Sequence, residues 1–327
     1  MENIQRSVTS SSHSDLCFFD PAHPELLMET FSDELLHARY ILKGKPILIK
    51  GLLNNSDSWN LEFLCNHIGT QTFPVRTYGR ERYQQDKRQW KDMGSGVSVS
   101  SITFEAYADL ILNGDAHRYD IYLARCSLKG TSLEKSPVLA QAEQHLKLSN
   151  PVTSQNLWCG PAGHTSCLHY DPMDGTLVQL SGTKQVTLFP PSQLYNLYPF
   201  SVWNHLFYGA KRRAVYSKVY PDTPDLKAFP KFKSAMPYRL DITLQPGDML
   251  FIPAGWWHEV TSVGDGVVCS INRWWNVPLQ RALSNWSKLR AHIGSVLGMP
   301  HTLLDLLDAM TSSDRRQQKL KVLIQSF

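Results

Sequence analysis

The sequence of 327 residues lacks the marks of secreted, membrane-spanning and zinc-finger proteins. Its six cysteines are scattered and form no Cys-x-x-Cys pair, which favours free thiols in a reducing compartment. The first residues are polar and contain no apolar segment typical of a secretory signal. No apolar run reaches the ~18 residues that suggest a membrane span. We therefore expect a cytoplasmic or nuclear protein with no membrane partner.

Strong charge of either sign is also missing. The net charge is +4 and charged residues make up 19% of the chain, short of the basic bias of a dedicated nucleic-acid-binding protein. We therefore do not expect nucleic acid as a partner. The hydrophobic content of 42% is enough for a sizeable core.

The hydrophobic pattern divides the chain into an arm, a large domain and a helical extension. Residues 1–20 are rich in serine and are interpreted as a flexible arm. Residues 21–278 are expected to form one domain, and 279–327 a helical extension. Helices are expected at 24–41, 58–69 (with Ser58 as cap and Gly69 as stop) and 102–114, and strands at 45–53, 71–79 and 119–128. A loop is expected at 80–100, and a loop with a short amphipathic helix at 129–150.

The sequence pattern changes between residues 154 and 276. Short runs rich in β-forming residues are separated by Gly, Pro and Asp turns, with one long connection at 192–238. Such spacing is typical of an antiparallel sandwich or barrel. The fold class is therefore mainly β with flanking helices.

One of three His-x-acid pairs stands in a strand. His13 with Asp15 and His23 with Glu25 lie in polar or proline-flanked segments near the N-terminus and are interpreted as solvated. His169 and Asp171 lie in a predicted strand, where positions two apart project to the same face. Both side chains are therefore candidates to bind one cation.

A third ligand should come from a distant strand, and His258 is the candidate. It follows a Pro-Gly-Asp turn, an apolar strand and two tryptophans, a buried setting that would keep its imidazole neutral. Two histidines and one carboxylate form the facial triad of non-haem Fe(II) oxygenases, with positions open for a co-substrate and dioxygen. A zinc hydrolase also uses such ligands, although the general-base motif His-Glu-x-x-His is missing.

Lys184 precedes an apolar strand and would face the same cavity. A buried ammonium needs an anion, which one carboxylate of a dicarboxylate co-substrate would supply while its keto-acid end binds iron. Three further polar residues in other strands are candidates to donate hydrogen bonds to that co-substrate: Ser166, Tyr122 and Asn272.

At these residues the chain resembles the Jumonji-C (cupin-like) Fe(II)- and 2-oxoglutarate-dependent oxygenases, and more closely their small hydroxylase branch. The resemblance runs from about residue 41 and is densest over 154–276. It rests on the segments GPAGHTSCLHYDP, LVQLSGTKQVTLFPP, LQPGDMLFIPAGWWHEV and SINRWW, in that order.

The resemblance implies a double-stranded β-helix (jelly-roll) core that binds Fe(II), 2-oxoglutarate and O2. It implies His169, Asp171 and His258 as iron ligands and Lys184 as partner of the 2-oxoglutarate carboxylate. Ser166, Tyr122 and Asn272 would be its hydrogen-bond donors. Gly175 departs from the family pattern, because members often carry an amide side chain there.

Hydroxylation of a C–H bond in a protein side chain is the expected reaction, with succinate and CO2 as co-products. Oxidation of a small metabolite, RNA-base hydroxylation and a non-catalytic binding module are the alternatives. The chain carries no reader domain, zinc finger or nuclear-localisation cluster, which argues against a chromatin demethylase.

Substrate residues are harder to assign. Trp257, Trp274 and Arg76 are candidate substrate contacts near the inferred mouth. The basic segment 76–88 either lies over that mouth or is a solvated loop, and the second interpretation is favoured. The resemblance also implies a homodimer formed through the C-terminal helices, with packing of those helices on their own barrel as the alternative.

Overall fold

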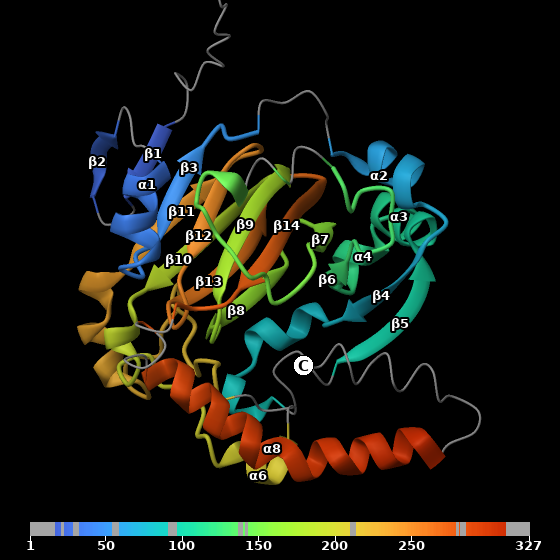
Figure 1. Cartoon of the computed structure of the whole chain (residues 1–327). Helices are drawn as coiled ribbons and strands as arrows, with labels where there is room; N and C mark the ends of the chain where they lie inside the picture. The colour runs from blue at the N-terminus through green and yellow to red at the C-terminus, as the bar shows by residue number, and fades with distance from the viewer. Residues whose placement is uncertain are drawn as a thin grey trace, which may run out of the picture.

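The computed structural model describes residues 17–20, 23–28, 33–53, 59–90, 97–136, 140, 143–209, 214–278, 281 and 286–311. The centre of the molecule is a pair of β-sheets (Figure 1). The larger has the strand order β2-β1-β3-β12-β9-β14-β7-β6-β4-β5 and the smaller the order β11-β10-β13-β8. Neighbouring strands in both sheets pair antiparallel. This jelly-roll confirms the predicted fold class.

Strands far apart in sequence alternate in these sheets, so the barrel is assembled by long-range pairing. The larger sheet contains β1 (Cys17–Asp20), β2 (His23–Met28), β3 (Ile47–Lys50), β4 (Thr72–Thr77), β5 (Ser98–Thr103), β6 (Ile121–Ser127), β7 (Asn156–Pro161), β9 (Asp174–Ser181), β12 (Met249–Ile252) and β14 (Val267–Trp275). The smaller sheet contains β8 (Thr165–Tyr170), β10 (Thr183–Phe189), β11 (Leu240–Leu244) and β13 (Trp257–Val263).

Helices and short turns surround the sheets. The helices are α1 (Asp33–Leu36), α2 (Leu61–Ile68), α3 (Phe104–Leu112), α4 (Asp115–Arg118), α6 (Asn204–Tyr208) and α8 (Trp286–Thr311). A π-helical turn covers His37–Ile41, and 3₁₀ turns cover Arg80–Gln84, Lys87–Gln89, Pro191–Gln193, Pro230–Ser234 and Met236–Tyr238. Among the described residues, no helix is both long and apolar enough to cross a bilayer.

Three apolar clusters hold the layers together. One joins the two sheets, since it contains Leu177 of β9 and Leu250 of β12 together with Val186 and Leu188 of β10. A second, larger cluster packs the outer face of the large sheet against α2 and α3. A third includes Trp257 of the small sheet and Ala291 of α8. Burial of this apolar area is the main stabilising term of the fold.

Capping residues mark the ends of two helices, and one of these ends was predicted. Gly69 is the C-cap of α2, as predicted. The N-cap of that helix is Asn60, whose side chain accepts a hydrogen bond from Phe63 N at 2.9 Å; Ser58 lies outside the described residues. The Thr103 side chain caps α3 in the same way.

Three N-terminal expectations were wrong. Cys17–Asp20, expected within the arm, forms β1 and pairs with β3. His23–Met28, expected to begin a helix, forms β2 and pairs with β1. Ser98–Thr103, expected partly in a loop, forms β5 on the edge of the large sheet. In each case backbone pairing in the sheet outweighs local propensity: β1 pairs with β3, β2 with the neighbouring β1, and β5 with β4. The rest of the predicted arm, 1–16, lies outside the described residues.

Helix α8 has one face on the barrel and one in solvent, and runs below the sheets in the view of Figure 1. Arg290 is buried on the inner face and donates to the backbone carbonyls of Ala214 and Phe200. Large apolar side chains are exposed along the outer face: Trp286, Leu289, Ile293, Val296, Met299, Leu303, Leu304 and Leu307.

Candidate metal centre

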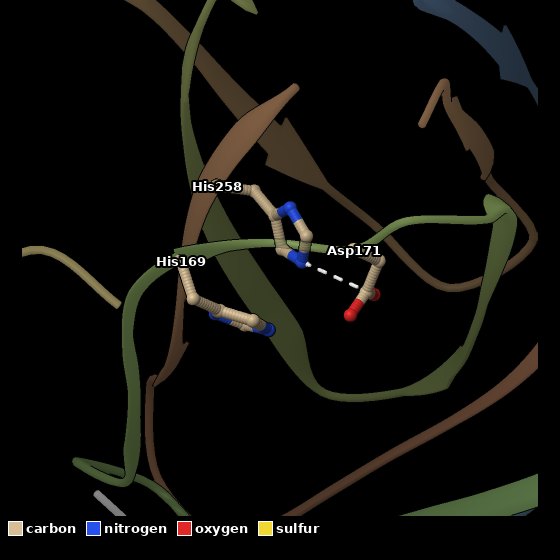
Figure 2. A group of neighbouring side chains, drawn as sticks. All are labelled: His169, Asp171 and His258. Carbon is tan, nitrogen blue, oxygen red and sulfur yellow. Dashed lines mark ion pairs between the residues drawn. The ribbon is translucent and has the colours of Figure 1, made fainter. Parts of the chain in front are cut away.

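Three side chains with metal-binding groups converge in the structure (Figure 2). His169 on β8 stands directly opposite His258 on β13, because these strands pair antiparallel. Asp171 follows the end of β8, and its carbonyl accepts a 2.8 Å hydrogen bond from Gly255 N in the turn before β13. One ligand atom from each residue lies within 4.8 Å of the others, and His258 Nε2 is 3.8 Å from Asp171 Oδ2.

Both imidazoles are oriented by the backbone. His169 Nδ1 lies 2.8 Å from the carbonyl oxygen of Cys167, and His258 Nδ1 lies 3.1 Å from that of Trp256. A carbonyl only accepts, so each Nδ1 carries the proton and each Nε2 keeps the lone pair with which an imidazole binds a metal. Such outer hydrogen bonds are the usual way that ligating histidines are fixed in one tautomer.

The Asp171 carboxylate is kept ionised. Burial by itself would raise its pKa, but the neighbouring His169 and His258 and a hydrogen bond from Trp274 bring the pKa below its ordinary value. The bond from Trp274 Nε1 to Asp171 Oδ2 is 2.9 Å long. One carboxylate oxygen is thereby engaged, and the group remains an anionic ligand.

This donor set fits a divalent transition metal. Two neutral imidazole nitrogens and one carboxylate oxygen are the ligands of the two-histidine-one-carboxylate iron(II) sites, which leave further coordination positions open. The three groups are partly or largely buried, which limits competition from bulk water. The residues present therefore fit Fe(II).

A cavity of about 80 Å³ joins the triad to Lys184. The Lys184 side chain is buried and donates a hydrogen bond to Ser270 Oγ. In the described part of the chain no carboxylate lies within 4.0 Å of its ammonium group. Burial disfavours the charged form and lowers the pKa of Lys184 to about 8. An incoming anion would restore the charge, so this end of the cavity is suited to a carboxylate.

Two of the three predicted hydrogen-bond donors line this cavity, Ser166 and Asn272. Asn272 Oδ1 accepts a 2.7 Å hydrogen bond from Trp158 Nε1, which fixes the amide and leaves its NH2 group to donate. The cavity also contains Gly175, where an added Cβ would meet no atom closer than Ile252 O at 3.8 Å. At Gly175 the cavity therefore has open space where an amide side chain would otherwise stand.

Tyr122 is outside the lining of that cavity. It is buried and stacks on His164, with ring centroids 3.7 Å apart. Burial raises the pKa of Tyr122, and the neighbouring Ser262, the residue opposite Lys184 in the sheet, lowers it in part. Its place is thus behind the Lys184 end of the cavity.

Two of the three expected substrate residues line a cavity beside the triad, and one does not. Trp274 and Arg76 line a neighbouring cavity that also contains His169 and Asp171. Trp257 was wrongly placed at the mouth: it is fully buried and packs edge-on against Tyr170 at 4.8 Å. The reason is the pleat of β13, because consecutive residues face opposite sides and His258 takes the side of the metal.

Sequence reasoning missed two residues around the triad. Tyr216, in the long connection 192–238, stacks on the His169 ring with centroids 5.0 Å apart. Arg125 on β6 lines the cavities beside Asp171 and has a positive φ of 56° at a break in the β6–β7 register. Neither the connection nor the bulge has a local sequence signal.

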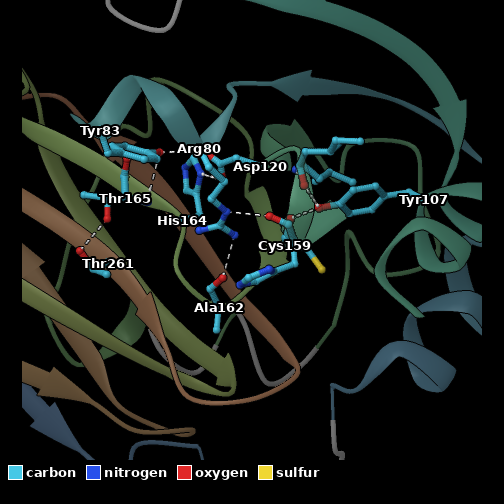
Figure 3. Close-up of polar contacts among 12 residues, drawn as sticks. Arg80, Tyr83, Tyr107, Asp120, Cys159, Ala162, His164, Thr165 and Thr261 are labelled. Atoms are coloured by element: carbon cyan, nitrogen blue, oxygen red, sulfur yellow. Dashed lines mark hydrogen bonds and ion pairs between the residues drawn. The ribbon is translucent and has the colours of Figure 1, made fainter. Parts of the chain in front are cut away.

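A buried polar cluster supports the wall next to the triad (Figure 3). His164 Nδ1 donates to Asp120 Oδ1 at 2.9 Å, and Tyr83 OH donates to Asp120 Oδ2 at 2.8 Å. Arg80 donates to the carbonyl oxygens of His117 and Ala162. These bonds fix the 3₁₀ turn Arg80–Gln84 against β8.

Comparisons with known proteins agree with this architecture. Over 199 residues the chain is 30% identical to lysine-specific demethylase JMJ31 of Arabidopsis thaliana, covering 59% of this chain and 34% of that protein. It is 25% identical over 257 residues to lysine-specific demethylase 8 of Xenopus tropicalis, covering 72% and 49%. It is 42% identical over 120 residues to human HSPB1-associated protein 1, covering 36% and 22%.

The chain spans less than half the length of each of these three relatives. The model of the cupin-like domain matches residues 32–281, which include both sheets except β1 and β2 and all three candidate ligands. The chain therefore belongs to the cupin-like Jumonji-C domain family.

Proposed function

We propose that this protein is an Fe(II)- and 2-oxoglutarate-dependent dioxygenase that hydroxylates a C–H bond in a protein side chain. One observation carries the proposal: a two-histidine-one-carboxylate triad shares a small cavity with Lys184, a buried lysine that has no carboxylate partner among the described residues. A metal site and an anion site in one small cavity match a chelating dicarboxylate. A zinc hydrolase would have no use for the second site.

His169, Asp171 and His258 would hold the iron. Lys184 would pair with the distal carboxylate of 2-oxoglutarate, while the NH2 group of Asn272 and the Ser166 hydroxyl would donate to the co-substrate. Iron and 2-oxoglutarate together supply the activation of dioxygen. The overall reaction converts R–H, 2-oxoglutarate and O2 to R–OH, succinate and CO2.

The residues of this chain orient and shield that chemistry. Trp274 donates to Asp171 Oδ2 and would hold the carboxylate in place as a ligand. The Tyr216 ring covers one face of His169 and excludes water from it. The protein part of the mechanism is therefore positioning and desolvation.

The test has two stages. Fe(II) is titrated into the protein without oxygen in the presence of 2-oxoglutarate, and formation of the visible charge-transfer band of the chelate is recorded. The loaded protein is then incubated in air with cell extract, and peptides and metabolites are searched for a +O mass shift that His169→Ala abolishes. A shift on peptides supports side-chain hydroxylation, and a shift on metabolites alone supports the small-molecule alternative. No band and no succinate would favour a non-catalytic module.

A further inference from the structure

Two further cavities border the triad, and Lys184 is not among the residues that line them. One of about 140 Å³ and one of about 170 Å³ share four lining residues, Arg125, Asp171, Val215 and Trp274. Both volumes are below the ~300 Å³ at which pockets for drug-sized ligands begin. Each therefore suits a single side chain of a polypeptide better than a whole nucleotide.

The charged side chains that line these cavities are mainly cationic. Three arginines line the 140 Å³ cavity, Arg76, Arg82 and Arg125, and all three are half-buried. Among the described residues that line either cavity, the only acidic one is Asp171, which the metal would use. A cationic group that approached the metal would meet three like charges at reduced dielectric, whereas an anion would be attracted.

Two of these arginines have no acidic partner in the described part of the chain. Some arginines elsewhere are paired with a carboxylate, among them Arg273 with Glu143 at 2.5 Å and Arg239 with Asp241 at 2.8 Å. For Arg76 and Arg82, no carboxylate oxygen among the described residues lies within 4.0 Å. A guanidinium group that faces a cavity and has no carboxylate partner is typical of a site that binds a carboxylate.

Arg82 is held in place before any ligand arrives. Its guanidinium lies over Trp90, 4.0 Å from the ring centroid, and near Tyr78 at 5.2 Å. The next residue, Tyr83, is tied to buried Asp120 in the polar cluster of Figure 3. Because the turn is fixed, little conformational entropy remains to be lost when Arg82 binds an anion.

Arg125 is placed by a strained backbone. Its φ of 56° is in the left-handed region, which costs a non-glycine residue energy and is found chiefly at functional sites. The bulge directs the guanidinium over Trp274, 5.1 Å from its ring centroid, and close enough to Asp171 to contribute to its electrostatics. Arg125 thus lies where the two cavities meet, beside the metal.

We propose that the substrate is an acidic polypeptide segment, an inference that rests on the proposed function. An Asp or Glu side chain close to the oxidised residue binds Arg82 and Arg125, and Arg76 adds to the positive electrostatic potential. The same arginines disfavour a methylated lysine beside the metal. The substrate class of this chain therefore differs from the one that the names of its demethylase relatives indicate.

The test compares degenerate nonapeptide libraries with one fixed residue, Glu, Gln or Lys, at each position in turn. Protein loaded with Mn(II) and 2-oxoglutarate is mixed with each library, and the retained fraction is measured by mass spectrometry. We expect at least about tenfold greater retention of the Glu libraries at a subset of positions, as one charge-assisted bidentate contact would give. Equal retention of the Gln libraries, or greater retention of the Lys libraries, overturns the proposal.

Variants locate the effect. The double variant Arg82→Gln, Arg125→Gln should lose the preference for Glu, and Arg82→Glu should shift it toward Lys. Arg88→Gln is the control, because Arg88 is in the same basic segment but pairs with Asp86 outside the cavity. A preference that survives the double variant, or that Arg88→Gln removes, contradicts the proposal. So does displacement of the Glu libraries by a single-stranded oligonucleotide that binds in the same cavity.

This outcome is separable from that of the proposed function. Succinate formed from 2-oxoglutarate in the absence of any peptide reports the oxygenase, and peptide retention reports the arginines. Succinate formation without a Glu preference would refute only the acidic substrate. Thermal unfolding and Mn(II) affinity confirm that each variant is folded and loaded.

Discussion

His169 and His258 are cross-strand partners, facing each other on adjacent antiparallel strands with ring centroids 4.2 Å apart. The register of one strand pair thus sets the spacing of two ligands. A slip of one residue would turn one of the histidines to the opposite face of the sheet. The metal centre consequently depends on the packing that fixes β8 against β13.

Removal of a ligand should abolish metal binding without unfolding the protein. For His258→Ala we expect the affinity for Mn(II) to fall at least about 100-fold, because two ligands are left. The measurement is the electron paramagnetic resonance signal of free Mn(II) during a titration. His117→Ala is the matched control, since His117 is exposed on α4. Equal affinities of the two variants would contradict the assigned triad.

Lys184 is expected to bind 2-oxoglutarate and to lower the stability of the apo protein. Lowering the pKa from its ordinary value of 10.5 to about 8 corresponds to a penalty of about 3 kcal/mol on the charged form at neutral pH. Lys184→Met should therefore abolish binding of 2-oxoglutarate while the apo protein unfolds at an equal or higher temperature. Exposed Lys233→Met should change neither property. A large drop in melting temperature for Lys184→Met would show that the lysine is structural.

The same shift predicts a pH dependence of stability. Folded protein holds Lys184 with a pKa of about 8 and the unfolded chain holds it near 10.5, so between these values the unfolded state binds more protons. The contribution of Lys184 should therefore make the free energy of unfolding of the apo protein rise with pH between these two values. Urea unfolding at pH 7.5 and 9.5 should show a smaller gain, or a loss, in Lys184→Met.

Affinity for 2-oxoglutarate should change in the opposite direction. Above pH 8 the free lysine is increasingly neutral, and binding the carboxylate then requires uptake of a proton. The dissociation constant should rise by up to about tenfold per pH unit above 8. Calorimetry in two buffers of different ionisation enthalpy would detect the proton. A flat profile between pH 7 and 9.5 would remove Lys184 from the anion site.

Trp274 is expected to tune the metal through Asp171. Trp274→Phe keeps the ring but deletes the 2.9 Å hydrogen bond to Asp171 Oδ2, and the affinity for Mn(II) should fall about 10- to 100-fold. Trp275→Phe is a matched control, because it deletes a bond of 3.2 Å to Thr176 Oγ1 instead. If both variants bound the metal equally, the bond to Asp171 would be without effect on the ligand.

The predicted homodimer can be tested on the outer face of α8. Val296 and Leu303 are exposed there, so Val296→Glu with Leu303→Glu should leave the fold intact and convert a dimer to a monomer. Leu112→Glu is the control, because Leu112 is also exposed but belongs to α3, which lies away from α8 (Figure 1). Light scattering that gives a monomer for the unchanged protein at micromolar concentration would rule out the dimer.

Much of the fold could be predicted because its strands are short, separated by turns and rich in β-forming residues. β3, β4 and β6 and the barrel strands after residue 154 were found by that pattern. The strands β1, β2 and β5 were missed because their place in the sheet has no local sequence signal: β1 pairs with remote β3, β2 is stabilised only through β1, and β5 pairs with β4. The same reason hid Tyr216, which reaches His169 from an irregular connection.

Residue type and strand period by themselves determined the candidate ligands of this protein. His169 and Asp171 share a face because side chains repeat every two residues along a strand, and the turn before β13 singled out His258. Only the tertiary structure decided what surrounds them. Trp257 faces the core and Trp274 the metal, and a bulge in β6 brings Arg125 to the cavity. These outcomes depend on how strands pair and sheets pack, which no local pattern encodes.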